Sequence, residues 1–199
     1  PDRPSAILGH GESPLPQMLE GVRQLRRAGA TAIAIACNTA HHWHAELERE
    51  GGLPILHIAD AVCSELDARG IHGGKVGLIS TEGTVHAGFY QDRFAKHGLD
   101  CMPSSREDQD SLVLPAIAAV KANDLARAHQ LAIAAVSRLQ AAGAQAVVLA
   151  CTETPVAVDF AEHPVAVHCI DATRALARAC VAWHRRASAR HLDKSAANR

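Results

Sequence analysis

The sequence is poor in aromatic residues, and several patterns that identify common protein classes are missing from it. Phe, Trp and Tyr together make up 3% of the 199 residues, so we expect a core built from Ala, Val, Leu and Ile. No apolar run approaches the roughly 18 residues of a membrane span. A formal net charge of −1 gives no electrostatic reason to expect nucleic acid or an anionic membrane as a partner. A signal-peptide pattern is also lacking, so we expect a cytoplasmic protein.

Motifs for common cofactors and metals are missing as well. None of the six cysteines belongs to a CxxC pair, which argues against a zinc ribbon and a thioredoxin site. A chain of this size with 48% apolar residues does not need a disulfide framework, so we expect free thiols. There is no GxGxxG motif and no P-loop, so no nucleotide cofactor is expected.

Predicted strands alternate with predicted helices, which indicates an α/β fold with parallel sheets. Short apolar runs predict buried strands at 31–36, 53–58, 75–80, 147–150 and 165–170. Apolar residues at helical spacing predict helices at 13–28, 40–50, 60–68, 88–97, 112–121, 125–142 and 173–186. We expect residues 102–105 to form a loop and the polar tail from Ala187 to be loosely held.

An internal repeat is the strongest structural signal. Residues 25–39 match residues 139–153, with identical residues at 25/139, 28/142, 29/143, 30/144, 32/146, 36/150 and 37/151. Each copy predicts a helix, an Ala-Gly-Ala turn, a buried strand and then a cysteine. Ligands of open α/β sheets bind at the carboxyl ends of the strands. We therefore predict two Rossmann-like parallel-sheet domains related by a pseudo-twofold axis, with the active site in the cleft between them.

The repeat places Cys37 and Cys151 on opposite sides of that cleft. Removing and restoring a proton at a stereocentre needs a base on one face of a carbon and an acid on the other. A thiol with an ordinary pKa of about 8.5 can do both after a modest shift. A lone cysteine at a strand end is more often a small buried hydrophobe, but two cysteines at matching positions of a repeat favour a catalytic role. We interpret the other cysteines as structural, at positions 63, 101, 169 and 180.

Both cysteine segments resemble signature motifs of the aspartate/glutamate racemase superfamily, and the likeness covers essentially the whole chain. The segments are Ala36-Cys-Asn-Thr-Ala-His41 and Ala150-Cys-Thr-Glu153. Glutamate racemases usually carry histidine after the second Cys-Thr, so Glu153 favours the aspartate racemase branch, as do Pro1-Asp2-Arg3 and Thr81-Glu-Gly-Thr84. The resemblance implies a homodimeric amino-acid racemase, an isomerase that uses no pyridoxal phosphate, metal or nucleotide.

The resemblance also assigns roles to individual residues. Cys37 and Cys151 match the catalytic pair, and the positions implicated in substrate binding correspond to Asp2, Arg3 and Lys121. Arg3 can fork onto a carboxylate, and Lys121 can hold a second carboxylate or stabilise carbanion charge. The alternative for Lys121 is a solvated surface lysine. The remaining predicted substrate-binding residues are Asn38, Thr39, Thr84, Thr152 and Glu153.

The histidines of the run His41-His42-Trp43-His44 invite a metal interpretation. Since His41 belongs to the resembled motif, we expect it to contact residues of the site rather than the substrate. We expect the other two on the surface of a helix, and no metal.

For the domains, we predict a first domain of residues 1–57 plus 160–199 and a second of residues 58–159. In this arrangement the C-terminal strand and helix return to the first domain. The strand at 76–80 and the loop at 81–84 have no counterpart after residue 1 at the 114-residue offset between the two cysteines. The resembled family opens with such a strand and loop, so we expect an N-terminal strand-helix-strand to be missing from this chain.

The predicted reaction is racemisation of an acidic amino acid, with aspartate as the first candidate, by two-base proton transfer at the α-carbon. Other enzymes with paired cysteines stay open: a glutamate, broad-spectrum or hydantoin racemase, or a maleate isomerase. A non-catalytic homologue that binds an acidic metabolite is a further alternative. The cysteine and histidine content also leaves a metal-binding or redox protein open.

Overall fold

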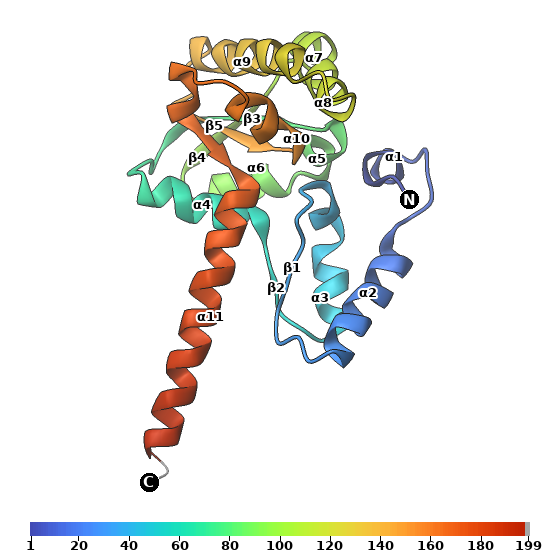
Figure 1. The fold of residues 1–199 in the computed structure, drawn as a ribbon, viewed down its shortest axis with the longest axis vertical. Coiled ribbons are helices and arrows are strands. Elements are labelled where there is room, and N and C mark those ends of the chain that lie inside the picture. Colours follow the sequence, from blue (N-terminus) through green and yellow to red (C-terminus); the bar gives the residue numbers. More distant parts are fainter. Residues whose placement is uncertain (198–199) are drawn as a thin grey trace.

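The computed structural model describes residues 1–197 and contains two parallel β-sheets with helices packed against them (Figure 1). One sheet has two strands in the order β1-β2, and the other has four in the order β4-β3-β5-β6. Every strand pair is parallel. The predicted α/β class with two parallel-sheet units is confirmed.

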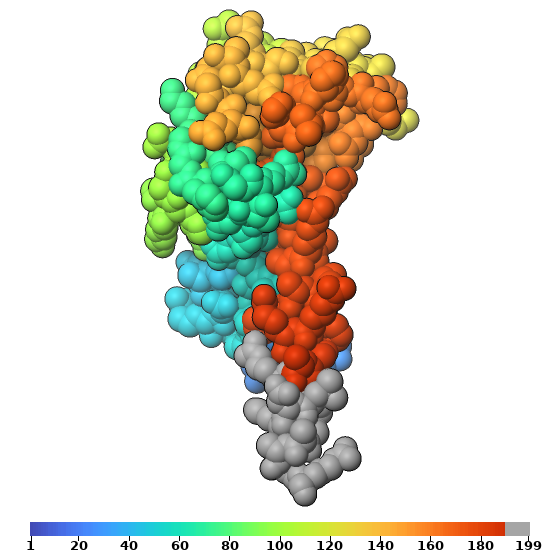
Figure 2. All heavy atoms as spheres, turned by 90° about the vertical axis from the view of Figure 1, so that its left-hand side faces the viewer, coloured from blue at the N-terminus to red at the C-terminus, as the bar shows by residue number. Residues whose placement is uncertain are grey.

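The four-stranded sheet is covered on both faces. Its strands are β3 (Gly74–Ser80), β4 (Leu99–Pro103), β5 (Ala146–Ala150) and β6 (Cys169–Asp171). One face packs on α4 (Ile58–Ala68), α6 (Phe89–Lys96) and α11 (Ala172–Ala197). The other packs on α8 (Leu114–Lys121), α9 (Leu125–Ala141) and α10 (Glu153–Asp159). Burial on both faces explains the uninterrupted apolar sequence of β5. Figure 2 shows α4 and the first part of α11 side by side on the outer surface.

The two-stranded sheet is smaller and is covered on one face. It pairs β1 (Ile33–Ala34) with β2 (Ile55–Leu56), and α2 (Leu15–Arg27) and α3 (His44–Gly51) pack against it. The predicted buried strand at 31–36 is therefore wrong in its burial and length, because the ladder pairs only two residues of each strand and Ala34 and Ala36 are exposed.

Short elements connect these parts. They are α1 (Arg3–Ile7), a 3-10 helix at Thr39–Trp43, α5 (Glu82–Ala87), α7 (Arg106–Asp108), a π-helix at Gln109–Val113 and a 3-10 helix at Pro164–His168. The 3-10 helix at 39–43 and the helix α10 each begin two residues after the cysteine of one copy of the repeat.

The repeat seen in the sequence is also a structural repeat. In both copies the helix ends at a glycine in the left-handed conformation: Gly29 has φ 90° and Gly143 has φ 97°. In the first copy the N–H of Ala30 donates to the carbonyl of Leu25 at 3.0 Å, and the matching bond closes the second copy at 3.0 Å. Each turn then leads into a parallel strand and a cysteine. The structure thus presents Cys37 and Cys151 on two equivalent turns of chain.

Three details of the predicted elements are wrong. Residues 102–105 were expected to be loop, but β4 includes Met102 and Pro103 because it pairs with β3. The predicted strand at 165–170 is mostly a 3-10 helix, which Pro164 starts favourably as its first residue. The tail expected to be loose from Ala187 continues as α11 to Ala197, in keeping with its many good helix formers. The last two residues of that tail lie outside the described part.

The C-terminal strand does not pair with the first half as expected. β6 pairs with β5 in the four-stranded sheet, and α11 packs against α4. Burying Ile170 and Leu176 in the larger core explains this placement. The proposed domain boundaries stay a prediction. Among the described residues, no helix is long and apolar enough to cross a membrane.

Candidate active site

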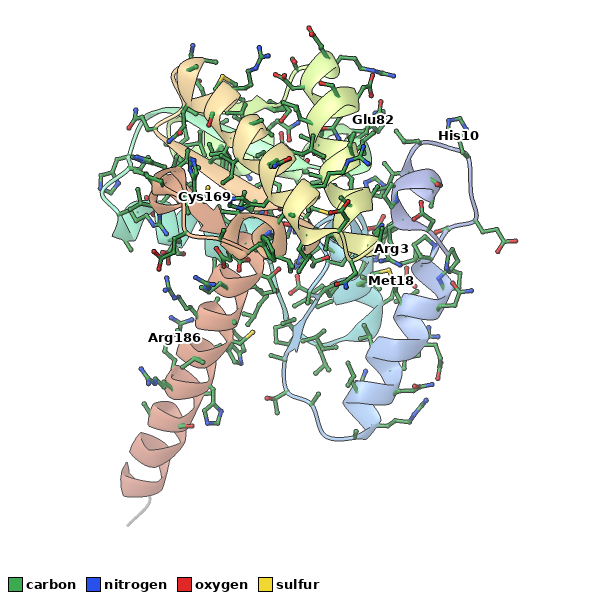
Figure 3. All side chains as sticks on the ribbon, turned by 45° about the horizontal axis from the view of Figure 1, so that its top comes forward. Arg3, His10, Met18, Glu82, Cys169 and Arg186 are labelled. Atoms are coloured by element: carbon green, nitrogen blue, oxygen red, sulfur yellow. The ribbon has the colours of Figure 1, made fainter. Side chains whose placement is uncertain are left out.

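A pocket lies at the carboxyl ends of β1 and β5, where the two sheets meet. Both Cys37 and Cys151 line it, each placed just after its strand. Of the predicted substrate-binding residues, seven also line the pocket: Asp2, Arg3, Asn38, Thr39, Lys121, Thr152 and Glu153. Figure 3 shows Arg3 on the side of the first half that faces the helices of the second. The structure therefore brings together residues that lie up to 151 positions apart in the sequence.

Cys151 is buried and hydrogen-bonded to a carboxylate. Its Sγ donates to Oε2 of Glu153 at 3.0 Å, and the hydroxyl of Thr152 donates to the same oxygen at 2.9 Å. Burial, and then the bond to Glu153 and its charge, raises the pKa of the Cys151 thiol to about 12. Burial also raises the pKa of Glu153, but the hydrogen bonds from Cys151 and Thr152 outweigh it and hold that pKa below its ordinary value. At neutral pH this pair is a thiol beside a carboxylate.

Lys121 approaches the same carboxylate from α8. Its Nζ lies 3.8 Å from Oε1 of Glu153, and two thirds of its side chain is exposed. An exposed pair of this kind contributes little to stability. The position at the pocket wall nevertheless leaves the ammonium within reach of a bound anion.

Replacing Glu153 by glutamine should make Cys151 easier to ionise. Loss of the negative charge lowers the pKa of the thiol, so more thiolate is present at pH 8 and alkylation by iodoacetamide accelerates. The rate should rise by up to about tenfold for each unit by which the pKa falls. Peptide mapping of alkylation against pH measures this for each cysteine separately.

Cys169 supplies an internal control for this substitution. Burial raises its pKa to about 12 as well, but Glu153 is not among the groups that influence it. Its alkylation should not change in Glu153→Gln. An unchanged rate at Cys151 would mean that burial alone sets its pKa.

Asn38 presents a buried donor without a partner. The hydroxyl of Tyr90 donates to Oδ1 of Asn38 at 2.6 Å, and Tyr90 is itself fully buried on α6. The Nδ2 group of Asn38 has no hydrogen-bond partner in the described part of the chain, although Asn38 is only 3% exposed. A buried amide without a partner is costly, and this one belongs to a residue of the pocket wall. It is suited to bind an acceptor on a ligand.

Three threonine hydroxyls join the two halves beside the pocket. Thr39 contacts Thr81 at 3.0 Å and Thr84 at 2.9 Å, and Thr81 contacts Thr84 at 3.2 Å. Thr84 is fully buried and is not part of the pocket wall, so it reaches the pocket only through its neighbours. Thr81 lines the pocket, although it was not among the predicted substrate-binding residues. Its position directly after β3, at the carboxyl end of a central strand, is the signal that could have found it.

Asp2 and Arg3 enter the pocket on the short helix α1. Asp2 caps this helix, since its Oδ2 accepts from both the N–H and the hydroxyl of Ser5. These bonds, the side-chain bond first, lower the pKa of Asp2. Its carboxylate is thus engaged within α1, while Arg3 forms no ion pair in the described part of the chain. Arg3 is the cation of this pocket that has no carboxylate partner.

The histidine run divides between buried and exposed positions. His41 is 2% exposed, His42 is exposed, and His44 is partly buried because its Nε2 lies 2.8 Å from the carbonyl oxygen of Ile55. The expected surface position therefore holds for His42 only. Among the side chains that the structure describes, no group of three or more His, Cys, Asp or Glu is placed to hold a metal ion.

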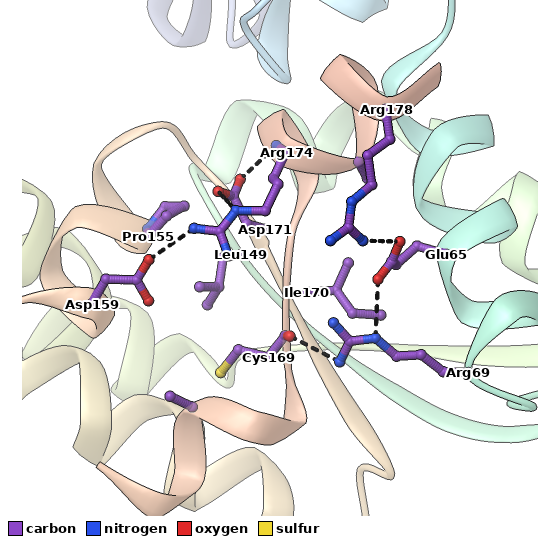
Figure 4. A pocket seen from close by; sticks show the side chains of 12 residues that line it. Glu65, Arg69, Leu149, Pro155, Asp159, Cys169, Ile170, Asp171, Arg174 and Arg178 are labelled. Carbon is purple, nitrogen blue, oxygen red and sulfur yellow. Dashed lines mark hydrogen bonds and ion pairs between the residues drawn. The ribbon is translucent and has the colours of Figure 1, made fainter. Parts of the chain in front are cut away.

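A second pocket lies between β6, α4, α10 and α11 (Figure 4). Arginines and carboxylates line it, but they already bind one another. Arg178 and Arg69 both contact Glu65, at 2.6 and 3.3 Å, and Arg174 contacts Asp159 at 3.2 Å. A site with no unpaired cation offers little to a ligand, so the cysteine pocket is the better candidate.

The chain is similar to known proteins over most of its length. A family model described as Asp/Glu/hydantoin racemase matches residues 1–180. The solved structure of the Picrophilus torridus aspartate racemase superimposes with a TM-score of 0.74 and 29% identity, covering 90% of this chain and 73% of that one. A broad specificity amino-acid racemase of Bacillus subtilis is 25% identical over 84% of this chain and 70% of its own length. An uncharacterised protein of Pectobacterium carotovorum is 30% identical over 71% of this chain and 93% of its own length.

Proposed function

Because this chain belongs to the Asp/Glu/hydantoin racemase family and is an amino-acid racemase by class, we propose that it interconverts the enantiomers of an acidic amino acid, with aspartate preferred. The proposed reaction is two-base proton transfer at the α-carbon, with Cys37 and Cys151 as the two acid/base groups. One observation carries the proposal: a single pocket is lined by both thiols, which come from different sheets on matched turns of chain.

Two thiols that line one pocket from different sheets suit inversion at carbon, which needs one acid/base group on each face. One thiolate removes the α-proton from one face, and the other thiol returns a proton to the opposite face, so the product is the mirror image. The thiolate gains the α-proton of the substrate, the other thiol loses its own proton to the α-carbon, and the reverse reaction exchanges the two roles. General acid–base catalysis of this kind contributes about 10²- to 10⁴-fold per group.

The environment of Cys151 sets its part in this cycle. With its pKa raised to about 12, Cys151 is the proton donor in the resting enzyme. The opposite direction starts from the state that this step leaves, with Cys151 as the thiolate and Cys37 as the thiol. When Cys151 is protonated, Oε2 of Glu153 accepts the hydrogen bond of its thiol at 3.0 Å and so orients it.

The pocket also offers groups for two carboxylates. Asn38 has the unpartnered buried amide that can donate to the α-carboxylate, whose charge grows as the α-proton leaves. Arg3 has no carboxylate partner and its planar fork matches a second, side-chain carboxylate. Aspartate carries both carboxylates within one small molecule, which is why we place it first.

Proton exchange with solvent tests this function directly. In deuterium oxide, L- and D-aspartate incubated with the protein should each gain deuterium at the α-carbon while the optical rotation falls to zero. Mass spectrometry and chiral chromatography measure the two events. If neither aspartate nor glutamate exchanges its α-proton, the proposal is wrong.

A broad specificity is the second candidate, because the Bacillus subtilis relative carries that activity in its name. Running the same exchange with L-alanine and L-lysine separates the two. Comparable rates on neutral and basic amino acids would favour the broad enzyme, whereas rates confined to aspartate and glutamate support the acidic one.

Gly83 on α5 should control how well α1 presents Arg3. A Cβ at this position would lie 2.9 Å from the Cα of Pro4, closer than real contacts allow, so Gly83→Ala forces α1 away. A displacement of a few tenths of an ångström should raise the KM for aspartate roughly tenfold, since a 1 Å misplacement costs about 10²-fold. The value of kcat should change less, because neither cysteine moves.

Gly21→Ala is the matched control for this substitution. Nothing lies within 4 Å of a Cβ at Gly21, which stands within the helix α2 outside the pocket. Its KM should equal that of the wild type. A wild-type KM in Gly83→Ala would show that α1 does not need its close contact with α5.

A further inference from the structure

His41 connects Cys37 to the first turn of α4. Its Nδ1 lies 2.9 Å from the carbonyl oxygen of Cys37, and the N–H of Ile58 donates to its Nε2 at 3.2 Å. Because a backbone N–H can only donate, Nε2 must be the unprotonated nitrogen and Nδ1 carries the proton. His41 therefore donates to Cys37 and accepts from Ile58 in one consistent neutral tautomer.

The surroundings of His41 keep it neutral. It is 2% exposed, and the rings of His57 and Phe89 pack against it with centroids at 4.7 and 6.1 Å. Burial lowers the pKa of His41 to about 4, so it carries no charge at neutral pH. His57 similarly accepts from the next N–H of α4, that of Ala59, at 3.1 Å. Two neutral imidazoles thus bind the first two residues of this helix.

The backbone at Cys37 has few other attachments. The β1–β2 ladder pairs only two residues from each strand, and β1 ends at Ala34. The N–H of Cys37 donates to the carbonyl of Ile35 at 2.8 Å, a bond confined to its own three-residue turn. By contrast, α4 is anchored in the largest core, where Ile58 and Val62 are fully buried. The bond from His41 therefore ties the backbone of Cys37 itself to a well-held helix, in addition to the side-chain bonds that Asn38 and Thr39 make to the second half.

We propose that His41 is a positioning residue, which fixes the Cys37 thiol at the pocket by linking its carbonyl to the N-terminus of α4. This inference rests on the proposed function, in which Cys37 is an acid/base group. In it, α4 of the second half of the molecule holds Cys37 of the first half in position. His41 itself is not part of the pocket wall and does not touch the substrate.

Two substitutions separate the two bonds of His41. Asparagine places an amide N–H where Nδ1 stands, so His41→Asn retains the donor to Cys37 and loses the acceptor for Ile58. Glutamine places an oxygen near Nε2, so His41→Gln retains the acceptor and loses the donor. Because the link needs both bonds, the proposal predicts that each variant lowers kcat by about 10²-fold, the usual effect of a 1 Å misplacement, with little change in KM.

His44→Gln is the matched control. His44 belongs to the same ring cluster, with its centroid 4.6 Å from that of His57, and its Nε2 contacts the carbonyl of Ile55 rather than that of Cys37. Its kcat should not change. If kcat instead follows Tm across all three variants, His41 is only a structural residue and the proposal is overturned.

Alkylation of Cys37 by iodoacetamide tests the proposal without any substrate. His41→Gln should change the rate at Cys37 several-fold and leave the rate at Cys151 unaltered. If the wild type racemises nothing but this change is seen, the positioning inference stands and the proposed function fails. If racemisation is present and Cys37 reacts alike in every variant, the positioning inference fails alone.

Discussion

Replacing either Cys37 or Cys151 by alanine will abolish racemisation of aspartate while leaving the fold intact. In the proposed mechanism each substitution removes the acid/base group that serves one face of the α-carbon. The rate should fall by at least about 10³-fold, within the range for loss of a general acid or base. The remaining thiol can still remove and return a proton on its own face. Each variant should therefore exchange the α-proton of one enantiomer without inverting it, and the two variants should act on opposite enantiomers.

The deuterium assay followed by chiral separation reads out both effects. Cys180→Ala is the control, because Cys180 lies on α11, is partly buried like Cys37, and is not part of the pocket. It should racemise at the wild-type rate. Retained inversion in either catalytic variant would refute the two-thiol mechanism, and exchange of the same enantiomer by both would refute the opposed arrangement.

Replacing Arg3 by glutamine should weaken the binding of aspartate more than any other single change outside the two cysteines. The guanidinium lines the pocket without an ion-pair partner in the described part of the chain, so its fork is available for a ligand carboxylate. Hydrogen bonds to charged groups contribute about 1.5–3 kcal/mol, which corresponds to a rise in KM of about 10- to 100-fold. Arg3→Lys should lie between, since an ammonium keeps the charge but loses the fork.

Steady-state kinetics on aspartate and alanine distinguish which carboxylate Arg3 holds. A rise in KM for aspartate alone indicates the side-chain carboxylate and supports selectivity for acidic substrates. An equal rise for both substrates would place the α-carboxylate at Arg3 and remove that argument. Arg23→Gln controls for the loss of an exposed arginine on the neighbouring helix α2, outside the pocket.

Much of the fold and the central pair of the site could be predicted, because both depend on local patterns. An apolar run predicts a buried parallel strand, and the Ala-Gly-Ala turn predicts a helix end, at Gly29 and at Gly143. The duplication of that pattern placed Cys37 and Cys151 together without any knowledge of pairing between distant segments. The positions that line the pocket follow the cysteines closely in sequence or match the resembled motifs.

What the sequence could not supply depends on long-range packing. Packing in the larger core determines which strand β6 pairs with, and the three residues of β6 carry no pattern that predicts it. Thr84 and Thr81 are equally polar in the sequence, yet the fold buries one completely and brings the other to the pocket. Asp2 looks like a ligand group from its motif, but Ser5 occupies its carboxylate in α1.

The pairing of Cys151 with Glu153 is a further case of this kind. The two residues are neighbours in the sequence, but the shift in the thiol pKa arises first from burial, which no motif encodes. A pKa shift caused by burial can therefore be found only once the positions of the surrounding helices are known.

The enclosure of the four-stranded sheet has a consequence for how the surroundings of Cys151 can change. Cys151 follows β5, whose residues are buried between helices on both faces of the sheet. A substitution near this cysteine must keep the packing of two helical layers, so changes of side-chain volume there should be tolerated poorly. Substitutions that alter specificity and keep the fold should therefore be rare around Cys151.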